Sequence, residues 1–304
     1  MDTIVVGVDA SERSRDALAL ARSLARNGTR LVLVCAYAAD RYRAGDGGSS
    51  YARALRADAD AVLAPLAGEI GSETIAIADR HPASALQEVA ARTGASLIVI
   101  GSTHHGLLRR VLPGGTGEHL LHGARCPIGI ASRGFSKREH ERFRNVACAF
   151  DGGHDSRLAL AYAAQLARDT GAHLEILRAT DPPGPIDATL AVDELGAAAA
   201  RRIRDRPMAE LRRVVAELDP LLEPEGTLLH GDPATALLRT SFVVDLMVLG
   251  SRGYGPWRGV LLGSVSARVI RAAGCPVIVV PHSVPEASTT EAATASGRQE
   301  SGVV

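Results

Sequence analysis

Lysine is almost absent from this chain of 304 residues: Lys137 is the only one, and every other basic residue is arginine. Aromatic residues make up only 3% of the sequence, and the 34 basic residues are balanced by 34 acidic ones. A protein that binds nucleic acid usually carries a basic excess, and single-strand binders also stack bases on aromatic side chains. The composition therefore predicts a protein that does not bind nucleic acid.

Cysteine is scarce as well, and long apolar segments are missing. The four cysteines, Cys35, Cys126, Cys148 and Cys275, form no CxxC pair, which argues against a zinc knuckle or a redox dithiol. Buried free thiols in a reducing cytoplasm are the simplest interpretation. No run is long enough to span a bilayer, and the N-terminus has no basic leader. We therefore expect a cytoplasmic protein with no membrane segment.

The sequence does contain an internal repeat. The matching segments are residues 4–9 with 146–151, 97–102 with 246–251, and 126–128 with 275–277. We therefore predict two copies of one fold. Copy one is residues 1–132 and copy two is residues 145–282. A polar linker at 133–144 joins them, and a tail at 283–304, rich in small and polar residues, is expected to be disordered.

Each copy alternates apolar strand patterns with helical patterns. In copy one the predicted strands are 3–9, 31–36, 73–78, 96–100 and 127–131, with helices at 13–27, 52–66, 83–93 and 115–123. In copy two the strands are 145–150, 173–178, 226–230, 244–249 and 276–280, with helices at 156–169, 188–218, 233–240 and 264–273. Such alternation predicts an α/β fold, with a doubly wound, five-stranded, mostly parallel sheet in each copy.

Copy two carries a spaced glycine motif where a ligand is expected. Ligands of doubly wound sheets bind beyond the carboxyl ends of the strands. There the sequence reads G-x-x-G-x9-G-S, with Gly250, Gly253, Gly263 and Ser264 at the fixed positions. The first two glycines allow close approach of the backbone, and the last pair opens a helix whose free N–H groups favour an anion. Asp151, at a neighbouring strand end, can accept from a ribose hydroxyl or an adenine amino group.

This spacing resembles that of the ATP-binding members of the universal stress protein family, and copy one fits the same template. The resemblance covers nearly the whole chain to about residue 282. It implies ATP as ligand, with or without Mg²⁺, and a stress-response regulator that acts through nucleotide-dependent conformation or an unidentified partner protein. It also implies that the last strands of the two copies pair antiparallel, as an internal pseudo-dimer. Whether two chains associate further stays open.

The resemblance also assigns the site residues of copy two. Asp151 would contact the adenosine and Ala179 the adenine. Leu249, Gly250, Arg252 and Gly253 would line the ribose and phosphates, and Gly263, Ser264, Val265 and Ser266 would hold the triphosphate. The hydroxyls of Ser264 and Ser266 can donate to phosphate oxygens. This set is the predicted nucleotide site of copy two.

Copy one departs from the pattern. His104 stands where the second glycine is expected, and Gly115 stands where the serine is expected. The candidates that remain are Asp9, Ala36, Gly101, Gly114 and Thr116. We therefore expect an asymmetric pair whose stronger site is in copy two, with binding in copy one left open.

Other activities have weaker support. Residues 151–156 (DGGHDS) resemble the S-G-G-x-D-S loop of PP-loop pyrophosphatases, but an aspartate replaces the opening serine. For ATP hydrolysis, the sequence offers neither a convincing general base nor a P-loop lysine, so no catalytic residue is predicted. His119 and His122 lie three apart on a predicted helix, where a solvated face is favoured over a metal site. An enzyme and a ligand-free protein of the same fold remain the alternatives.

Overall fold

Strands and helices alternate along the chain in the predicted order. The computed structural model describes residues 1–39, 50–68, 72–102, 115–121, 123–138, 143–180, 194–251 and 263–282, with the backbone alone at 194–204. Copy one contains β1 (Thr3–Gly7), α1 (Arg13–Leu24), β2 (Arg30–Tyr37), α2 (Ser50–Gly68), β3 (Glu73–Ala78), α3 (Pro82–Thr93), β4 (Leu97–Gly101), α4 (Thr116–Leu121) and β5 (Ile128–Ala131). A short 3-10 helix, η2 (Phe135–Lys137), follows.

Copy two repeats this order. It contains β6 (Asn145–Ala149), α5 (His154–Thr170), β7 (His173–Thr180), α7 (Glu194–Glu217), η4 (Pro220–Leu222), β8 (Glu225–His230), α8 (Pro233–Thr240), β9 (Leu246–Gly250), α9 (Ser264–Ala272) and β10 (Val277–Val280). The helix expected at 188–218 is observed from Glu194, and residues 181–193 lie outside the described part. The predicted α/β class is confirmed.

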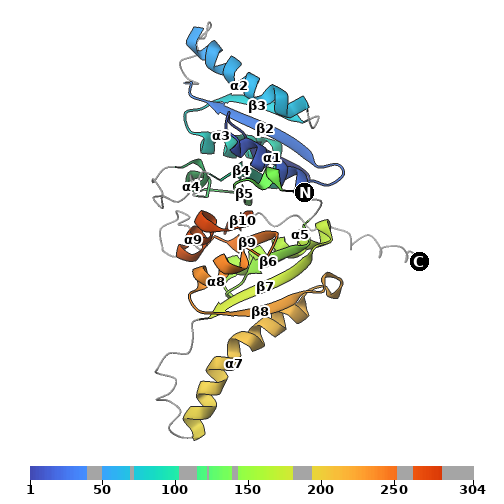
Figure 1. The fold of residues 1–304 in the computed structure, drawn as a ribbon, viewed down its shortest axis with the longest axis vertical. Coiled ribbons are helices and arrows are strands. Elements are labelled where there is room, and N and C mark those ends of the chain that lie inside the picture. The colour runs from blue at the N-terminus through green and yellow to red at the C-terminus, as the bar shows by residue number, and fades with distance from the viewer. Residues whose placement is uncertain are drawn as a thin grey trace, which may run out of the picture.

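The two copies share one sheet of ten strands, in the order β3-β2-β1-β4-β5-β10-β9-β6-β7-β8 (Figure 1). Strands within a copy run parallel, whereas β5 and β10 pair antiparallel, with Ile130 opposite Val277 and Ile128 opposite Val279. Both strands consist only of apolar residues and glycine, and all of these residues are buried. Without its partner, each strand would be an exposed, aggregation-prone edge of the sheet. The expected pairing of the last strands is therefore confirmed.

Helices cover both faces of the sheet (Figure 1). Alternation along β1 explains the two layers, because Ile4 and Val6 join one core cluster while Val5 joins the other. The first cluster packs under α1, α2, α5 and α7, and the second under α3, α4, α8 and α9. Each cluster contains residues of both copies, so the hydrophobic core continues across the β5–β10 junction.

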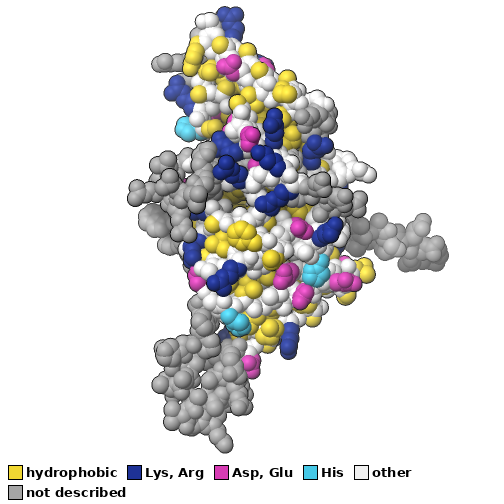
Figure 2. Space-filling model, viewed as in Figure 1, with side chains coloured by type: hydrophobic (Ala, Val, Ile, Leu, Met, Phe, Trp, Pro, Cys, Tyr) yellow, Lys and Arg dark blue, Asp and Glu magenta, His cyan; other side chains and the backbone are white. Residues whose placement is uncertain are grey.

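The charges balance in total, with 34 basic and 34 acidic residues, but they are not evenly distributed over the surface. On the face shown in Figure 2, Lys and Arg side chains gather around the middle, where the copies meet, and acidic side chains lie on both sides of them. None of the described helices combines the length and the apolar character that a membrane span requires.

The predicted linker at 133–144 is polar in composition, but its two aromatic side chains are buried. Phe135 and Phe143 are buried, and their rings stack with centroids 6.4 Å apart. The buried carboxylate of Asp16 in α1 accepts hydrogen bonds from the backbone N–H of Gly134 (2.8 Å) and from the N–H (2.9 Å) and hydroxyl (2.7 Å) of Ser136. Residues 134–136 of the predicted linker are thus anchored to copy one, whereas the backbone N–H of Arg144 donates to Asp245 of copy two at 2.8 Å.

All four cysteines are unpaired, as predicted, and three are buried while Cys126 is half-buried. Burial raises the pKa of the Cys126 thiol to about 11 and that of Cys275 to about 12. Because the thiolate is the reactive form, these side chains act as small apolar groups at neutral pH.

Candidate functional site

Four candidates of copy one surround a single cavity. The cavity has a volume of about 140 Å³ and lies at the carboxyl ends of the strands. Its described lining is Gly7, Val8, Asp9, Arg13, Ser14, Val34, Ala36, Pro82, Leu86, Ile100, Gly101 and Thr116. The structure thus brings together four of the predicted candidates, Asp9, Ala36, Gly101 and Thr116. Gly114 lies outside the described residues.

Asp9 is the most heavily hydrogen-bonded of these residues. Its Oδ1 accepts from the backbone N–H of Ser11 (2.9 Å), from the Ser11 hydroxyl and from the Ser14 hydroxyl (3.0 Å), while Nη2 of Arg13 lies 3.2 Å from its Oδ2. Burial raises the pKa of Asp9, but the hydrogen bonds from Ser11 and Ser14 and the charge of Arg13 outweigh it, so the pKa lies below its ordinary value. Asp9 is therefore an ionised acceptor at neutral pH.

Sequence reasoning missed several residues of this cavity, above all Arg13. Ser14 could have been found from the sequence, because copy two has a serine, Ser156, at the matching position. Arg13 could not, because its counterpart in copy two is an acid, Asp155. Pro82 and Leu86 come from α3, whose amphipathic pattern marks them only as core residues.

The described candidates of copy two lie along one edge of the sheet. Asp151 follows β6, Ala179 lies near the end of β7, and Gly250 ends β9; these three strands are neighbours in the order β9-β6-β7. The Oδ1 atom of Asp151 accepts from the backbone N–H of Gly153 at 2.8 Å. Gly263 directly precedes α9, so it too stands at this edge. Arg252 and Gly253 lie outside the described residues.

Among the described residues, nothing opposes an anion at the N-terminus of α9. Gly263 is its N-cap residue, no described side chain caps it, and its first turn carries no acidic residue. The helix begins with a hydrogen bond from the Ala267 N–H to the Gly263 carbonyl (2.8 Å), which leaves the earlier N–H groups without helical partners. By contrast, α4 in copy one has only six residues and carries Glu118 in its first turn. The two copies therefore differ in how well they suit a phosphate.

Two motif residues have structural tasks that the sequence did not reveal. A Cβ atom on Gly250 would lie 2.6 Å from the carbonyl oxygen of Asp155, so this glycine allows α5 to pack against the end of β9. The hydroxyl of Ser266 donates to the Gly250 carbonyl (3.0 Å) and is buried. The sequence predicts only ligand contact for both residues. In the structure they also join α5, β9 and α9.

Three buried polar atoms near this edge of copy two have no hydrogen-bond partner among the described residues: Oδ2 of Asp155, Nη1 of Arg178 and Oγ of Ser251. Asp155 stands in the first turn of α5, and its other oxygen contacts Nδ1 of His282 at 2.6 Å. Ser251 follows β9, and Nη1 of Arg178 lies 3.5 Å from the place of a Cβ on Gly152. A buried polar atom left unpaired costs about 1–3 kcal/mol, so each of these three atoms can take a polar partner beyond the described residues.

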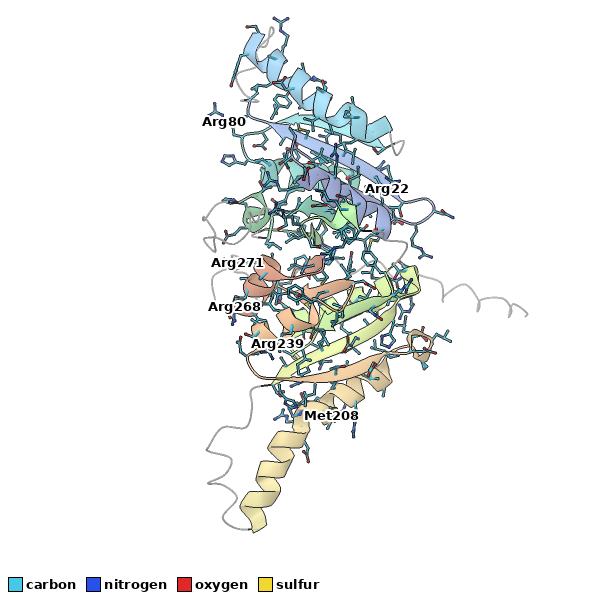
Figure 3. All side chains as sticks on the ribbon, viewed as in Figure 1. Arg22, Arg80, Met208, Arg239, Arg268 and Arg271 are labelled. Atoms are coloured by element: carbon cyan, nitrogen blue, oxygen red, sulfur yellow. The ribbon has the colours of Figure 1, made fainter. Side chains whose placement is uncertain are left out.

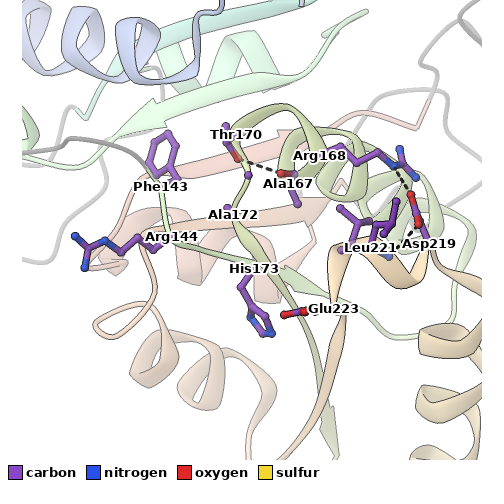
Figure 4. A pocket seen from close by; sticks show the side chains of 12 residues that line it. Phe143, Arg144, Ala167, Arg168, Thr170, Ala172, His173, Asp219, Leu221 and Glu223 are labelled. Atoms are coloured by element: carbon purple, nitrogen blue, oxygen red, sulfur yellow. Dashed lines mark hydrogen bonds and ion pairs between the residues drawn. The ribbon is translucent and has the colours of Figure 1, made fainter.

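A larger cavity, of about 930 Å³, lies at the opposite end of copy two (Figure 4). It is lined by Phe143 and Arg144 before β6, by the end of α5 and the start of β7, and by residues 219–223 around η4. Arg168 and Asp219 form an ion pair across its rim at 3.5 Å. None of the predicted site residues lies there, so size alone does not identify the site.

Comparisons with known proteins agree with this architecture. The sequence model of the universal stress protein family matches residues 1–131 and again residues 142–281. A universal stress protein of Mycolicibacterium smegmatis is 31% identical over 222 residues, which are 73% of this chain and 74% of that protein. The crystal structure of a universal stress protein from Archaeoglobus fulgidus has a TM-score of 0.63 at 20% identity and covers 92% of this chain and 98% of its own. A universal stress protein in complex with cAMP is 28% identical, with a TM-score of 0.31, over 45% of this chain and 97% of that one.

The fold and its internal duplication define a tandem α/β protein whose two halves share one sheet. With two matches that together span most of the sequence, the chain belongs to the universal stress protein family.

Proposed function

We propose that this protein is a cytoplasmic stress-response regulator that binds ATP, chiefly in copy two, and signals through a nucleotide-dependent change of conformation or partner. The four unpaired thiols favour the reducing cytoplasm. The site consists of Asp151 and Ala179 on the adenosine side, Leu249, Gly250, Arg252 and Gly253 around the ribose and phosphates, and Gly263, Ser264, Val265 and Ser266 at the triphosphate.

The observation that carries this proposal is the N-terminus of α9, which no described side chain caps. Its N–H groups and the positive end of its dipole favour a phosphate, and no acidic residue of the first turn opposes one. The six-residue α4, with Glu118 in its first turn, offers no such seat. This contrast supports a stronger triphosphate site in copy two than in copy one.

The unpaired polar atoms at the same edge add independent support. Oδ2 of Asp155 can accept from a ligand hydroxyl or a bound water, and Oγ of Ser251 can donate to a ligand oxygen. A nucleotide carries many acceptors and several hydroxyl donors, so its chemistry suits both atoms.

The surface beside α9 is basic. Arg268 and Arg271 of α9 and Arg239 of α8 are exposed and lie on one side of the molecule (Figure 3). Arg268 is held by Asp232 at 2.9 Å. Such a surface attracts a polyphosphate toward α9 and is also suited to an acidic partner protein.

Mg²⁺ would enter together with the nucleotide. Among the described residues, no group of three or more His, Cys, Asp or Glu side chains is arranged to hold a metal ion. Mg²⁺ commonly binds nucleotide phosphates with only one or two carboxylates from the protein. Phosphate oxygens would therefore supply most of its ligands here.

Heat denaturation of the purified full chain tests the proposal. The supernatant is expected to contain intact ATP, because a binder without catalytic residues retains its ligand unchanged. Chromatography and mass spectrometry identify the nucleotide. ADP or AMP accompanied by steady turnover would favour an enzyme instead, and an empty supernatant with no titratable ATP affinity would refute the proposal.

A further inference from the structure

The two copies carry opposite charges at one equivalent position of their sites. Arg13 in copy one and Asp155 in copy two each lie four residues after the aspartate at the end of the first strand. The backbone of each packs against the glycine that ends the fourth strand, Gly101 or Gly250. The positions are therefore structurally equivalent, and the change from a cation to an anion alters what each site can bind.

Arg13 supplies the positive charge of the copy-one cavity. Among the described residues that line this cavity, Arg13 is the one cation and Asp9 the one anion. Nη2 of Arg13 lies 3.2 Å from Asp9, and its Nε donates to the Ser11 hydroxyl at 3.0 Å. A guanidinium has five N–H donors, so Arg13 keeps capacity for a further acceptor.

The ion pair between Arg13 and Asp9 is readily exchanged. Both side chains are partly exposed, at 36% and 56%, and ion pairs of this kind contribute little to stability. Oδ1 of Asp9 already accepts from Ser11 and Ser14, so a ligand donor would approach Oδ2, where Arg13 now lies. Arg13 displaced in this way would remain beside the same cavity with its charge uncompensated.

We propose that Arg13 is a ligand-binding residue of copy one, and that copy one takes an adenine nucleoside monophosphate. Asp9 accepts from a hydroxyl or amino group of the ligand, and Arg13 leaves Asp9 to donate to the phosphate. This inference rests on the proposed function, because it gives Asp9 the same part that Asp151 has in copy two. Copy one would then be a second, chemically different site.

The charges around the cavity favour one phosphate over three. Glu118 in the first turn of α4 opposes an anion at the place where α9 of copy two would seat a triphosphate. Arg13 at the other side supplies charge for a single phosphate group.

The experiment uses the full chain carrying Asp151→Ala, which disables the proposed site of copy two. Calorimetric titrations compare AMP with adenosine before and after adding Arg13→Gln. AMP affinity is expected to fall at least about tenfold, since a charge-assisted contact is lost. Adenosine affinity is expected to stay the same or rise, because Asp9 no longer has to release Arg13. Arg15→Gln, an exposed residue of the same helix, is the matched control and should change neither affinity.

Opposite responses of the two ligands are the distinguishing result. The inference is overturned if the Asp151→Ala chain binds no AMP, if Arg13→Gln leaves AMP affinity unchanged, or if it weakens AMP and adenosine equally. ATP titration of the unmodified chain separates this failure from that of the proposed function. A chain that binds ATP but fails these tests loses only the role of Arg13, whereas one that binds no adenine nucleotide loses both proposals.

Discussion

Replacing Ser264 by glutamate is expected to weaken ATP binding about 100-fold, or about 2.8 kcal/mol, without destabilising the protein. Ser264 is exposed and is the first residue of α9, whose N-terminus would hold the phosphates. A carboxylate there stands beside the polyphosphate, and two like charges about 4 Å apart near a protein surface repel by about 4 kcal/mol. The same carboxylate interacts favourably with the helix dipole, so stability is expected to stay constant or rise slightly.

Calorimetry measures the affinity, and urea unfolding without nucleotide measures the stability. Ser264→Gln introduces a side chain of nearly the same shape as glutamate but without its charge, so it should weaken ATP binding far less than Ser264→Glu. Thr116→Glu places the same charge at α4 of copy one and should leave the high-affinity ATP site intact. Equal losses with Glu and Gln, or a loss of stability that parallels the loss of affinity, would contradict the assignment of α9 as the phosphate seat.

Gly250→Ala is expected to lower the free energy of unfolding by about 2–3 kcal/mol even in the absence of nucleotide. The new Cβ would lie 2.6 Å from the carbonyl oxygen and 2.7 Å from the carbonyl carbon of Asp155. These are backbone atoms in the first turn of α5, so relief requires the helix to move rather than a side chain to rotate. Movement of α5 would also disturb the hydrogen bond between Asp155 and His282.

Denaturant unfolding of the nucleotide-free protein measures this effect. Gly68→Ala is the matched control, because no described atom lies within 4 Å of a Cβ at that position and its backbone is not left-handed. That variant should differ from the unmodified chain by less than about 0.5 kcal/mol. If Gly250→Ala were as stable as the control and lost only ATP affinity, the packing role of Gly250 would be contradicted. The glycine would then be required only for the close approach of the ligand to the backbone.

The fold was largely predictable because its signals are local and occur twice. Apolar strands such as β4 and β9 are buried on both faces, and their matching sequences revealed the duplication. The anchoring of the connector was not predictable. Asp16 reads as an ordinary polar residue of an amphipathic helix, and its partners Gly134 and Ser136 lie 118 and 120 residues further along the chain. Contacts of that separation leave no periodic pattern.

The candidate site was predictable where a motif fixes the backbone at a strand end. It was not predictable where a side chain enters the cavity from a helix, as that of Arg13 does. The sequence located Asp9, Ala36, Gly101 and Thr116, which share one cavity, because strand ends of a parallel sheet meet at one edge. Arg13 was missed, since a surface arginine in the first turn of a helix has no distinctive pattern. The packing task of Gly250 was missed because only the position of α5 shows what a Cβ would meet.

The most direct test of the central claim is an ATP titration of three full-length proteins: the unmodified chain, Asp151→Ala and Asp9→Ala. Asp151 and Asp9 occupy equivalent strand ends in the two copies, so each variant is the control for the other. Asp151→Ala is expected to abolish the high-affinity ATP site, and Asp9→Ala is expected to leave it in place. Loss of that site in Asp9→Ala, with binding unchanged in Asp151→Ala, would contradict the central claim.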